Sequence, residues 1–397
     1  MEIIIALLVL LSASLIIGEL FRRAGLPSVA GQLIAGMVLG PMVLNIITPS
    51  DTLSNLSDIS LFFITFLIGV EVTTEVLTEH ISHALAFTAA SFIAPTVIMA
   101  LIAIFAFGLP PGQGVIVATA IGVPSISIIS VLLYRYGILQ SEPGHVILAS
   151  VVLTDVIAFG VLAATSGGAV STTFILIAVV VAIALLLLVD KGLRSHSRRL
   201  KDVFDSLIKS EEDEHFAFGG MLILGLIVAA LLQLIGITFV LGAFFAGMLI
   251  SEYAVGKSFY GLLTRTLRRI SDSFFIPLFF SIAALDVTLP GESLFALLFA
   301  MVAASIAIGG ILDYFTGKRF LPKISGRNTI GLFGGRGAVG IIIGSIALLE
   351  GIISTDLYSI IVFGTLIMAI VMPLLINRRL TSEAQKGSKG RRIGRRP

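Results

Sequence analysis

The chain has 397 residues, of which 57% are hydrophobic and 13% are charged, and its formal net charge at pH 7 is +2. Soluble domains carry about 25% charged residues, so this composition excludes a soluble globular protein and requires much of the apolar surface to face lipid. The lack of cysteine excludes disulfides and thiolate chemistry, five histidines do not favour a multi-histidine metal site, and the small net charge does not suggest a nucleic-acid partner.

Apolar stretches recur along the whole chain. A membrane-spanning helix needs about 20 mainly apolar residues. The first stretch is not predicted to be a cleavable signal peptide, because it lacks a basic segment and is followed by Arg22 and Arg23. The sequence predicts an all-α membrane protein with thirteen spans, at 3–21, 28–48, 56–76, 84–108, 113–134, 143–166, 170–190, 215–235, 237–254, 272–288, 292–316, 328–349 and 356–377.

Basic residues are confined to alternate connections between these spans. Of the 26 lysines and arginines, all except Arg336 fall after odd-numbered spans or in the tail, and the opposite connections carry none. Basic residues favour the cytoplasmic side, so we predict a multi-pass protein with its N-terminus outside and its C-terminus in the cytoplasm. The hydrophilic segment 191–214 is then a cytoplasmic loop, and 378–397 is a basic cytoplasmic tail that contacts anionic lipid.

The second half of the chain repeats features of the first. Partner spans lie seven apart, an odd number, so the two copies insert upside down relative to each other. We predict a transmembrane domain over 1–377, with inverted six-helix repeats at about 1–166 and 215–377 and a connector helix at 170–190. Such repeats are typical of secondary transporters. The echoes, at nearly one offset, are Gly25, Gly31 and Gly36 with Gly236, Gly242 and Gly247; Glu71 with Asp286; and Gly122 and Ser130 with Gly337 and Ser345.

Asp155 lies at the centre of the sixth predicted span. A carboxylate near the bilayer midplane costs on the order of 2.5–3.5 kcal/mol and is a functional candidate by default. Desolvation disfavours its ionised form, so such a group can exchange a proton for a cation. A structural, hydrogen-bonded aspartate is the alternative.

Two spans contain residues that interrupt helices. Pro124 in the fifth removes a backbone donor, and the freed carbonyls with the hydroxyls of Ser125 and Ser127 are candidate ligands for a small hard cation. In the twelfth, five glycines between positions 331 and 340 flank Arg336. No acidic residue follows at ribose distance, so this is not a dinucleotide loop, and we expect no cofactor. Half-helix ends direct partial charges to the centre. A proline kink and a structural arginine remain the alternatives.

Four further carboxylates lie near the inner ends of spans. Glu71 at the end of the third span is either a group that supports the site or an interfacial residue, and the sequence leaves both open. Asp313, Glu19 and Glu252 are predicted to be interfacial.

Four features resemble the monovalent cation:proton antiporter superfamily, in particular its Kef-like and NhaP-like branches. They are RRAGLPSVAGQLIAGMVLGP at 22–41, FLIGVE at 66–71, Asp155, and GRGAVG at 335–340. The resemblance covers nearly the whole chain. It implies a core domain with two crossed broken helices, a separate dimerisation domain and an elevator-like movement of the core. It also implies exchange of Na⁺ or K⁺ for a proton in the bilayer by a homodimer. Asp155 matches the residue that binds both ions, and Thr154 takes the place of its acidic or amide neighbour.

The chain also departs from these relatives. Electrogenic members have two adjacent acids in the sixth span and a lysine in the eleventh, whereas this chain has Thr154 and no such lysine. NhaP-like members pair the arginine of the twelfth span with a glutamate where this chain has Ser150, so Arg336 needs another partner. With Asp155 as the titrating group, we predict 1:1 electroneutral exchange. A sodium-coupled organic-anion symporter, a gated cation channel and a non-transporting sensor remain the alternatives.

Overall fold

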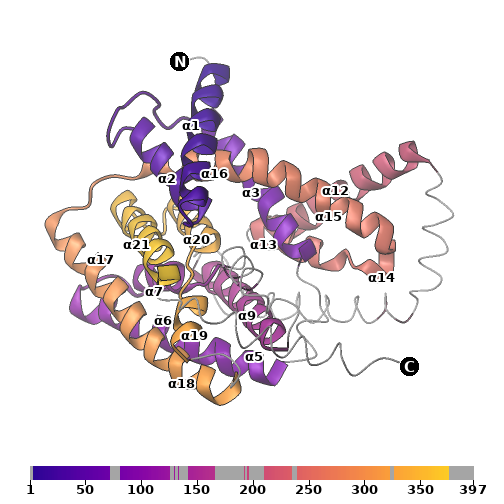
Figure 1. The fold of residues 1–397 in the computed structure, drawn as a ribbon. Helices are drawn as coiled ribbons and strands as arrows, with labels where there is room; N and C mark the ends of the chain where they lie inside the picture. The colour runs from indigo at the N-terminus through magenta and orange to yellow at the C-terminus, as the bar shows by residue number, and fades with distance from the viewer. Residues whose placement is uncertain are drawn as a thin grey trace. The chain divides into compact units, whose positions relative to one another are not determined.

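The computed structural model describes residues 3–71, 81–125, 129, 133, 142–165, 192, 195, 210–234, 239–321 and 326–374. Within these ranges the regular structure is helical, apart from one isolated antiparallel bridge (Figure 1). The predicted connector helix at 170–190, most of the 191–214 loop, Ser127 and the 378–397 tail lie outside the described residues.

Most of the described helices lie within predicted spans, whereas α15 falls between the spans predicted at 237–254 and 272–288. Seven helical stretches of the described ranges are long and apolar enough to cross a membrane, and shorter apolar helices lie between them. The count of thirteen spans stays a prediction. The helices are α1 (Ile3–Arg23), α2 (Ser28–Leu39), α3 (Asp51–Glu71), α5 (Ile81–Thr88), α6 (Ala94–Leu101), α7 (Pro111–Gly122), α9 (Glu142–Thr165), α12 (Glu211–Leu234), α13 (Phe239–Leu249), α14 (Glu252–Val255), α15 (Lys257–Ile270), α16 (Ile276–Ala283), α17 (Glu292–Ala304), α18 (Gly310–Phe320), α19 (Gly326–Phe333), α20 (Ala338–Leu349) and α21 (Thr355–Leu374).

Several helices are joined end to end by short π-helical segments. These are η1 (Ala89–Ile93), η2 (Ile102–Ala106), η3 (Ser271–Phe275) and η5 (Ser305–Gly309), and a 3₁₀ turn, η4 (Ala284–Asp286), follows α16. The stretch Ser82–Ala106 therefore runs from α5 through η1 and α6 to η2, and Glu292–Phe320 runs from α17 through η5 to α18. A π-helical turn inserts one residue into a helix and occurs frequently at functional sites.

The chain divides into two compact units, and each takes residues from both halves of the sequence. Unit 1 comprises Met1–Ile16, Gln32–Glu75 and Ala163–Leu285, and unit 2 comprises Ile17–Gly31, Val76–Leu162 and Asp286–Pro397. This division does not follow chain order, since α1 contributes to both units.

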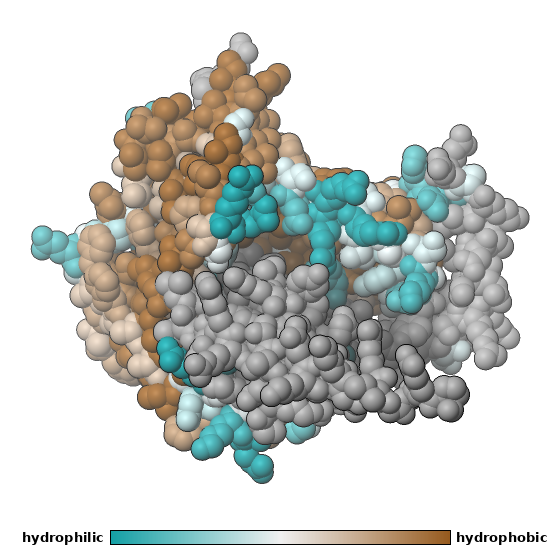
Figure 2. Space-filling model, in the orientation of Figure 1, coloured by the Kyte–Doolittle hydropathy of each residue, from teal (hydrophilic) through white to brown (hydrophobic). Residues whose placement is uncertain are grey.

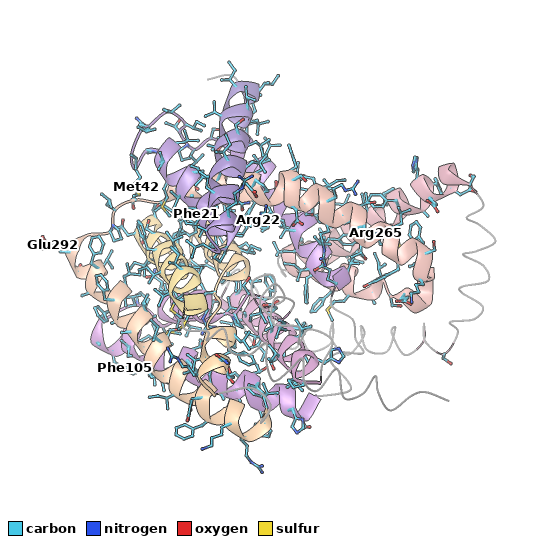
Figure 3. The ribbon with its side chains drawn as sticks, viewed as in Figure 1. Phe21, Arg22, Met42, Phe105, Arg265 and Glu292 are labelled. Atoms are coloured by element: carbon cyan, nitrogen blue, oxygen red, sulfur yellow. The ribbon has the colours of Figure 1, made fainter. Side chains whose placement is uncertain are left out.

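Unit 1 is built around the packing of α3 against α13. A side chain at Gly69 would collide with the Phe244 carbonyl oxygen, and one at Gly247 would collide with that of Phe66, so both glycines permit a close approach of the two helices. The amphipathic helix α15 buries Phe259, Leu263 and Leu267 in the same core, while Arg265 lies on its exposed face (Figure 3).

Unit 2 has its apolar core where α5, α9, α19 and α21 meet. The rings of Phe87 and Phe333 stack with their centroids 5.0 Å apart, and Val151 and Ala369 are buried in the same cluster. This cluster takes side chains both from α9, which carries Asp155, and from α19, which leads into the Arg336 segment.

Hydrophobic residues cover much of the coloured surface on the face that Figure 2 shows. Phe105 is 80% exposed, and Phe299 and Phe315 are each 63% exposed. Exposed apolar surface of this extent is unfavourable in water and is matched to the hydrocarbon core of a bilayer. The protein is therefore an integral membrane protein.

Candidate functional site

Two interrupted helices meet inside unit 2. Helix α7 ends at Gly122, and Val123 has extended backbone with φ −70° and ψ 125°. Helix α19 ends at Phe333, and α20 begins at Ala338. Between these ends, Pro124 and Arg336 form the antiparallel bridge, and the Ser125 amide donates to the Gly335 carbonyl over 2.8 Å.

The local sequence explains why the chain is extended at this point. Proline disfavours the helical conformation of the residue before it, which is Val123, and glycines give low helix propensity on the other strand of the bridge. A side chain at Gly340 would collide with the Ala120 carbonyl oxygen, so a residue without Cβ is needed where α20 approaches α7. The two breaks thus satisfy part of each other's backbone hydrogen bonding.

Asp155 is fully buried in α9, and neither of its carboxylate oxygens has a hydrogen-bond partner among the described residues. The neighbouring Thr154 hydroxyl donates to the Ser150 carbonyl over 2.8 Å, and Thr88 donates to the same carbonyl over 3.1 Å. Because the Thr154 hydrogen is committed to its own helix, the oxygen lone pairs remain available to a ligand. An unpartnered buried carboxylate is a costly arrangement that a proton or a cation relieves.

The predicted site residues gather in one unit with a single described exception. Asp155, Thr154, Pro124, Ser125 and Arg336 all belong to unit 2 and are all buried. Among the described residues, no group of three or more histidines, cysteines, aspartates or glutamates is placed to hold a metal ion. The assignment of Thr154, Ser125 and Ser127 as oxygen ligands beside Asp155 stays a prediction.

Glu71 is the exception, since it lies in unit 1 at the end of α3. Its Oε1 accepts from Arg268 Nε over 2.9 Å, and Arg268 Nη2 lies 2.7 Å from the same oxygen. Next to it, the Tyr260 hydroxyl donates to the Val70 carbonyl over 2.6 Å. The described contacts of Glu71 thus join α3 to α15, and the prediction that Glu71 supports the charges of the site remains a prediction.

Asp313 is the residue that the sequence analysis missed. It is 2% exposed in α18, so its assignment as an interfacial group is wrong. The helix continues to Phe320 and turns Gly310, Asp313 and Gly317 inward against α19. Their i, i+3, i+7 spacing is the sequence signal that predicts one buried helix face.

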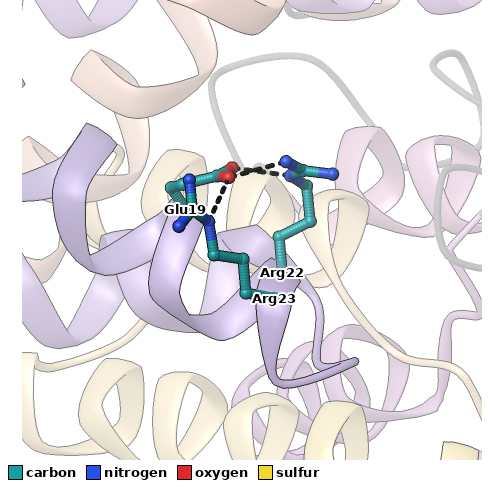
Figure 4. A network of polar contacts seen from close by, with 3 residues as sticks. All are labelled: Glu19, Arg22 and Arg23. Atoms are coloured by element: carbon teal, nitrogen blue, oxygen red, sulfur yellow. Dashed lines mark hydrogen bonds and ion pairs between the residues drawn. The ribbon is translucent and has the colours of Figure 1, made fainter.

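Glu19 and Glu252 differ from Asp313 in their exposure, and their interfacial position stays a prediction. Both lie on the surface of the described structure, and Glu19 accepts hydrogen bonds from Arg22 and Arg23 over 2.6 and 2.9 Å (Figure 4). A network of this kind at a helix end is solvated, and it places no charge in the interior.

The family described as "Sodium/hydrogen exchanger, transmembrane" matches residues 7–381. The chain belongs to this family. Members of the sodium/hydrogen exchanger family are transporters and not enzymes. The resemblance to monovalent cation:proton antiporters is thereby confirmed.

Individual relatives extend over nearly the full chain. The "Probable Na(+)/H(+) antiporter 3" of Methanocaldococcus jannaschii is 26% identical and covers 96% of this chain and 97% of its own length. The "Na(+)/H(+)-K(+) antiporter GerN" of Bacillus cereus is also 26% identical, with coverage of 96% and 97%. The solved structure of the sodium proton antiporter MjNhaP1 from Methanocaldococcus jannaschii has a TM-score of 0.65 at 16% identity and covers 97% of both chains. It shows that the fold is shared.

Proposed function

We propose that this protein is a secondary active antiporter that exchanges a monovalent cation, Na⁺ or K⁺, for a proton by competition at Asp155. The observation that carries the proposal is the fully buried Asp155 carboxylate, whose two oxygens have no described partner. The names of similar proteins support it: one is named a probable Na⁺/H⁺ antiporter and another an Na⁺/H⁺ antiporter. A third is named a potassium-efflux system protein, KefC of Klebsiella pneumoniae, and is 29% identical over 63% of this chain.

The chemistry follows from the cost of a buried charge. Protonated Asp155 is neutral and is tolerated in a low-dielectric interior, whereas ionised Asp155 requires a compensating cation. The hydroxyls of Thr154, Ser125 and Ser127 are the oxygen ligands that we assign beside the carboxylate. Since Na⁺ and K⁺ prefer oxygen donors, a cation and a proton compete for one group, and each is released on the side where the other is abundant.

We assign the moving core to unit 2, because it contains both interrupted helices and Asp155, and the dimerisation domain to unit 1. The predicted inverted repeats gain support from the π-helical segments. Segment η1 interrupts the fourth predicted span and η5 the eleventh, which are partner spans in the two repeats, at nearly the offset of the sequence echoes. Thirteen spans, an external N-terminus and a homodimer complete this architecture.

Exchange is electroneutral in this proposal. Asp155 carries either one proton or one monovalent cation, so the loaded unit has the same charge in both directions of transport. Arg336 stays protonated throughout, and Thr154 does not ionise near neutral pH.

The test is cation-driven proton movement in proteoliposomes with an acidic interior and an entrapped pH-sensitive dye. Addition of Na⁺ or K⁺ should raise the internal pH with the wild-type protein and should have no effect with Asp155→Asn. Asp58→Asn is the matched control, since Asp58 is an aspartate of α3 in unit 1. Cation current without proton movement, or sodium-dependent uptake of an organic anion, would contradict antiport.

A further inference from the structure

Arg336 is the largest fully buried side chain of the described structure. Its guanidinium makes few hydrogen bonds. Its Nη2 donates to Ser305 Oγ over a long 3.5 Å, while Nε and Nη1 have no partner among the described residues. A buried charge that lacks compensation destabilises a protein strongly. The position expected to supply a carboxylate is Ser150, whose hydroxyl donates to the Val146 carbonyl of its own helix. The compensation must come from elsewhere.

Besides Asp155, Asp313 is the carboxylate that is buried among the described residues of unit 2. It projects from the buried face of α18, and its Oδ1 has no hydrogen-bond partner in the described ranges. Helix α18 packs against α19, which leads into the Arg336 segment, and α18 follows η5, whose Ser305 accepts from Arg336. No direct ion pair joins the described side chains of Asp313 and Arg336, so an interaction between them acts through space. In an interior of low dielectric, such an interaction remains strong beyond contact distance.

The π-helical segments place two serines beside these charges. Segments η1 and η5 pack against each other, α18 packs against η1, and α6 packs against η5, where Gly309 lies next to Pro95. Ser305, the first residue of η5, accepts from Arg336. Ser91 in η1 lies beside Asp313, outside strict hydrogen-bond geometry. The extra residue of a π-helical turn rotates the side chains that follow it, and here hydroxyls lie next to both charged groups.

We propose that Asp313 is the counter-charge of Arg336, and that this pair positions the crossing of the interrupted helices. The backbone of Arg336 forms the bridge to Pro124. An electrostatic attraction that holds the Arg336 side chain therefore also holds the backbone at the crossing. Asp313 exerts this attraction from α18, and Ser91 and Ser305 are the polar neighbours of the pair. The pair also cancels the positive charge of Arg336 within the unit that carries Asp155. Only this last consequence rests on the proposed antiport function.

The first experiment is a double-mutant cycle of thermal unfolding, which needs no transport. The proteins are the wild type, Asp313→Asn, Arg336→Gln and the double variant. Each single variant should lower the melting temperature, because it leaves the opposite charge buried without compensation. The double variant should lose less than the sum of the two. In the matched cycle, Asp58→Asn with Arg336→Gln should be additive, since Asp58 lies in the other unit. Additive losses for Asp313 and Arg336 would overturn the pairing.

Variants that fail to fold are also informative. If Asp313→Asn gives no folded protein, Asp313→Glu should fold, because it retains the negative charge. If either single variant gives no folded protein, the double variant should fold, because it removes both charges. Failure of both to restore folding would overturn the proposal.

The second experiment separates a positioning role from a merely structural one. In Asp313→Asn the uncompensated Arg336 should repel the transported cation and raise its apparent KM on the order of tenfold, with little change in kcat. Asp313→Glu and the double variant should return KM towards that of the wild type. An unchanged KM in a less stable Asp313→Asn would reduce Asp313 to a structural residue and overturn this part. If the wild type shows no exchange, the proposed function fails, while the unfolding cycle still decides the pairing.

Discussion

The ion pair of Glu71 with Arg268 and the proposed pair of Asp313 with Arg336 differ in both contact and burial. Glu71 and Arg268 in unit 1 touch at 2.7 Å, but their side chains are 24% and 59% exposed. Asp313 and Arg336 in unit 2 make no direct contact, yet they are 2% and 1% exposed. Exposed pairs contribute about 0–1 kcal/mol because water screens them, whereas removal of one partner from a buried pair costs about 3–5 kcal/mol. Burial, more than distance, sets the consequence of a mutation.

Asp155→Asn should have the largest effect on transport, because the amide keeps the size of the side chain and cannot ionise. Cation-driven proton movement in proteoliposomes should fall to the background of protein-free vesicles. Asp155→Glu should retain partial activity with a shifted pH profile. Exchange at near wild-type rate in Asp155→Asn would remove Asp155 from the centre of the proposal.

Arg336→Ala should have the largest effect on stability, lowering the free energy of unfolding by about 3–5 kcal/mol, since it leaves Asp313 alone in the interior. Arg336→Lys should restore part of the loss, because lysine keeps the charge but lacks the planar fork. The chain has no tryptophan and no cysteine, so far-ultraviolet circular dichroism is the suitable measurement. A melting temperature of Arg336→Ala equal to that of the wild type would contradict the expected difference in stability between the two pairs.

Glu71→Gln should change the free energy of unfolding by about 1 kcal/mol or less, as expected of a partly exposed pair. The same measurement in high salt should reduce the difference further, because salt screens exposed charges. A loss as large as that of Arg336→Ala would show that exposure does not distinguish the pairs.

The pKa of Tyr260 should respond to the charge of Glu71, and this is the smallest of the expected effects. Burial, and then the negative charge of Glu71, raise the pKa of the Tyr260 phenol to about 12. Since the folded pKa lies above the unfolded value of about 10, the neutral phenol contributes stability below that pH, and this contribution is lost as the pH rises through about 12. Tyrosinate absorbance of the wild type minus that of Tyr260→Phe measures the pKa, which should fall in Glu71→Gln. An unaltered pKa would mean that Glu71 is screened from Tyr260.

Membrane voltage should have no effect on exchange if Asp155 alternates between one proton and one cation. Valinomycin with fixed K⁺ sets the potential in proteoliposomes, and Na⁺-driven proton movement is then recorded. A rate that changes systematically with voltage would require a second titrating group. Loss of that change in Glu71→Gln, with transport retained, would identify Glu71 as that group.

The sequence by itself determined the class of protein and the places where helices break. Apolar composition and the low charged fraction leave a bilayer as the only favourable surroundings. Pro124 and the glycines around Arg336 act on the local backbone, so their effect is readable along the chain. The prominence of Asp155 likewise follows from its central place in an apolar stretch, and the cost of burying a carboxylate does not depend on details of packing.

Only the tertiary structure decided which groups become partners. Asp313 lies within a few residues of basic Lys318 and Arg319 and has the sequence surroundings of a helix end, yet α19 and η1 cover it. The π-helical segments beside it depend on how spans four and eleven pack, since local propensity does not specify them. Burial of a charge and the identity of its counter-charge are set by neighbours distant in the sequence, and these neighbours are defined only when the helices are assembled.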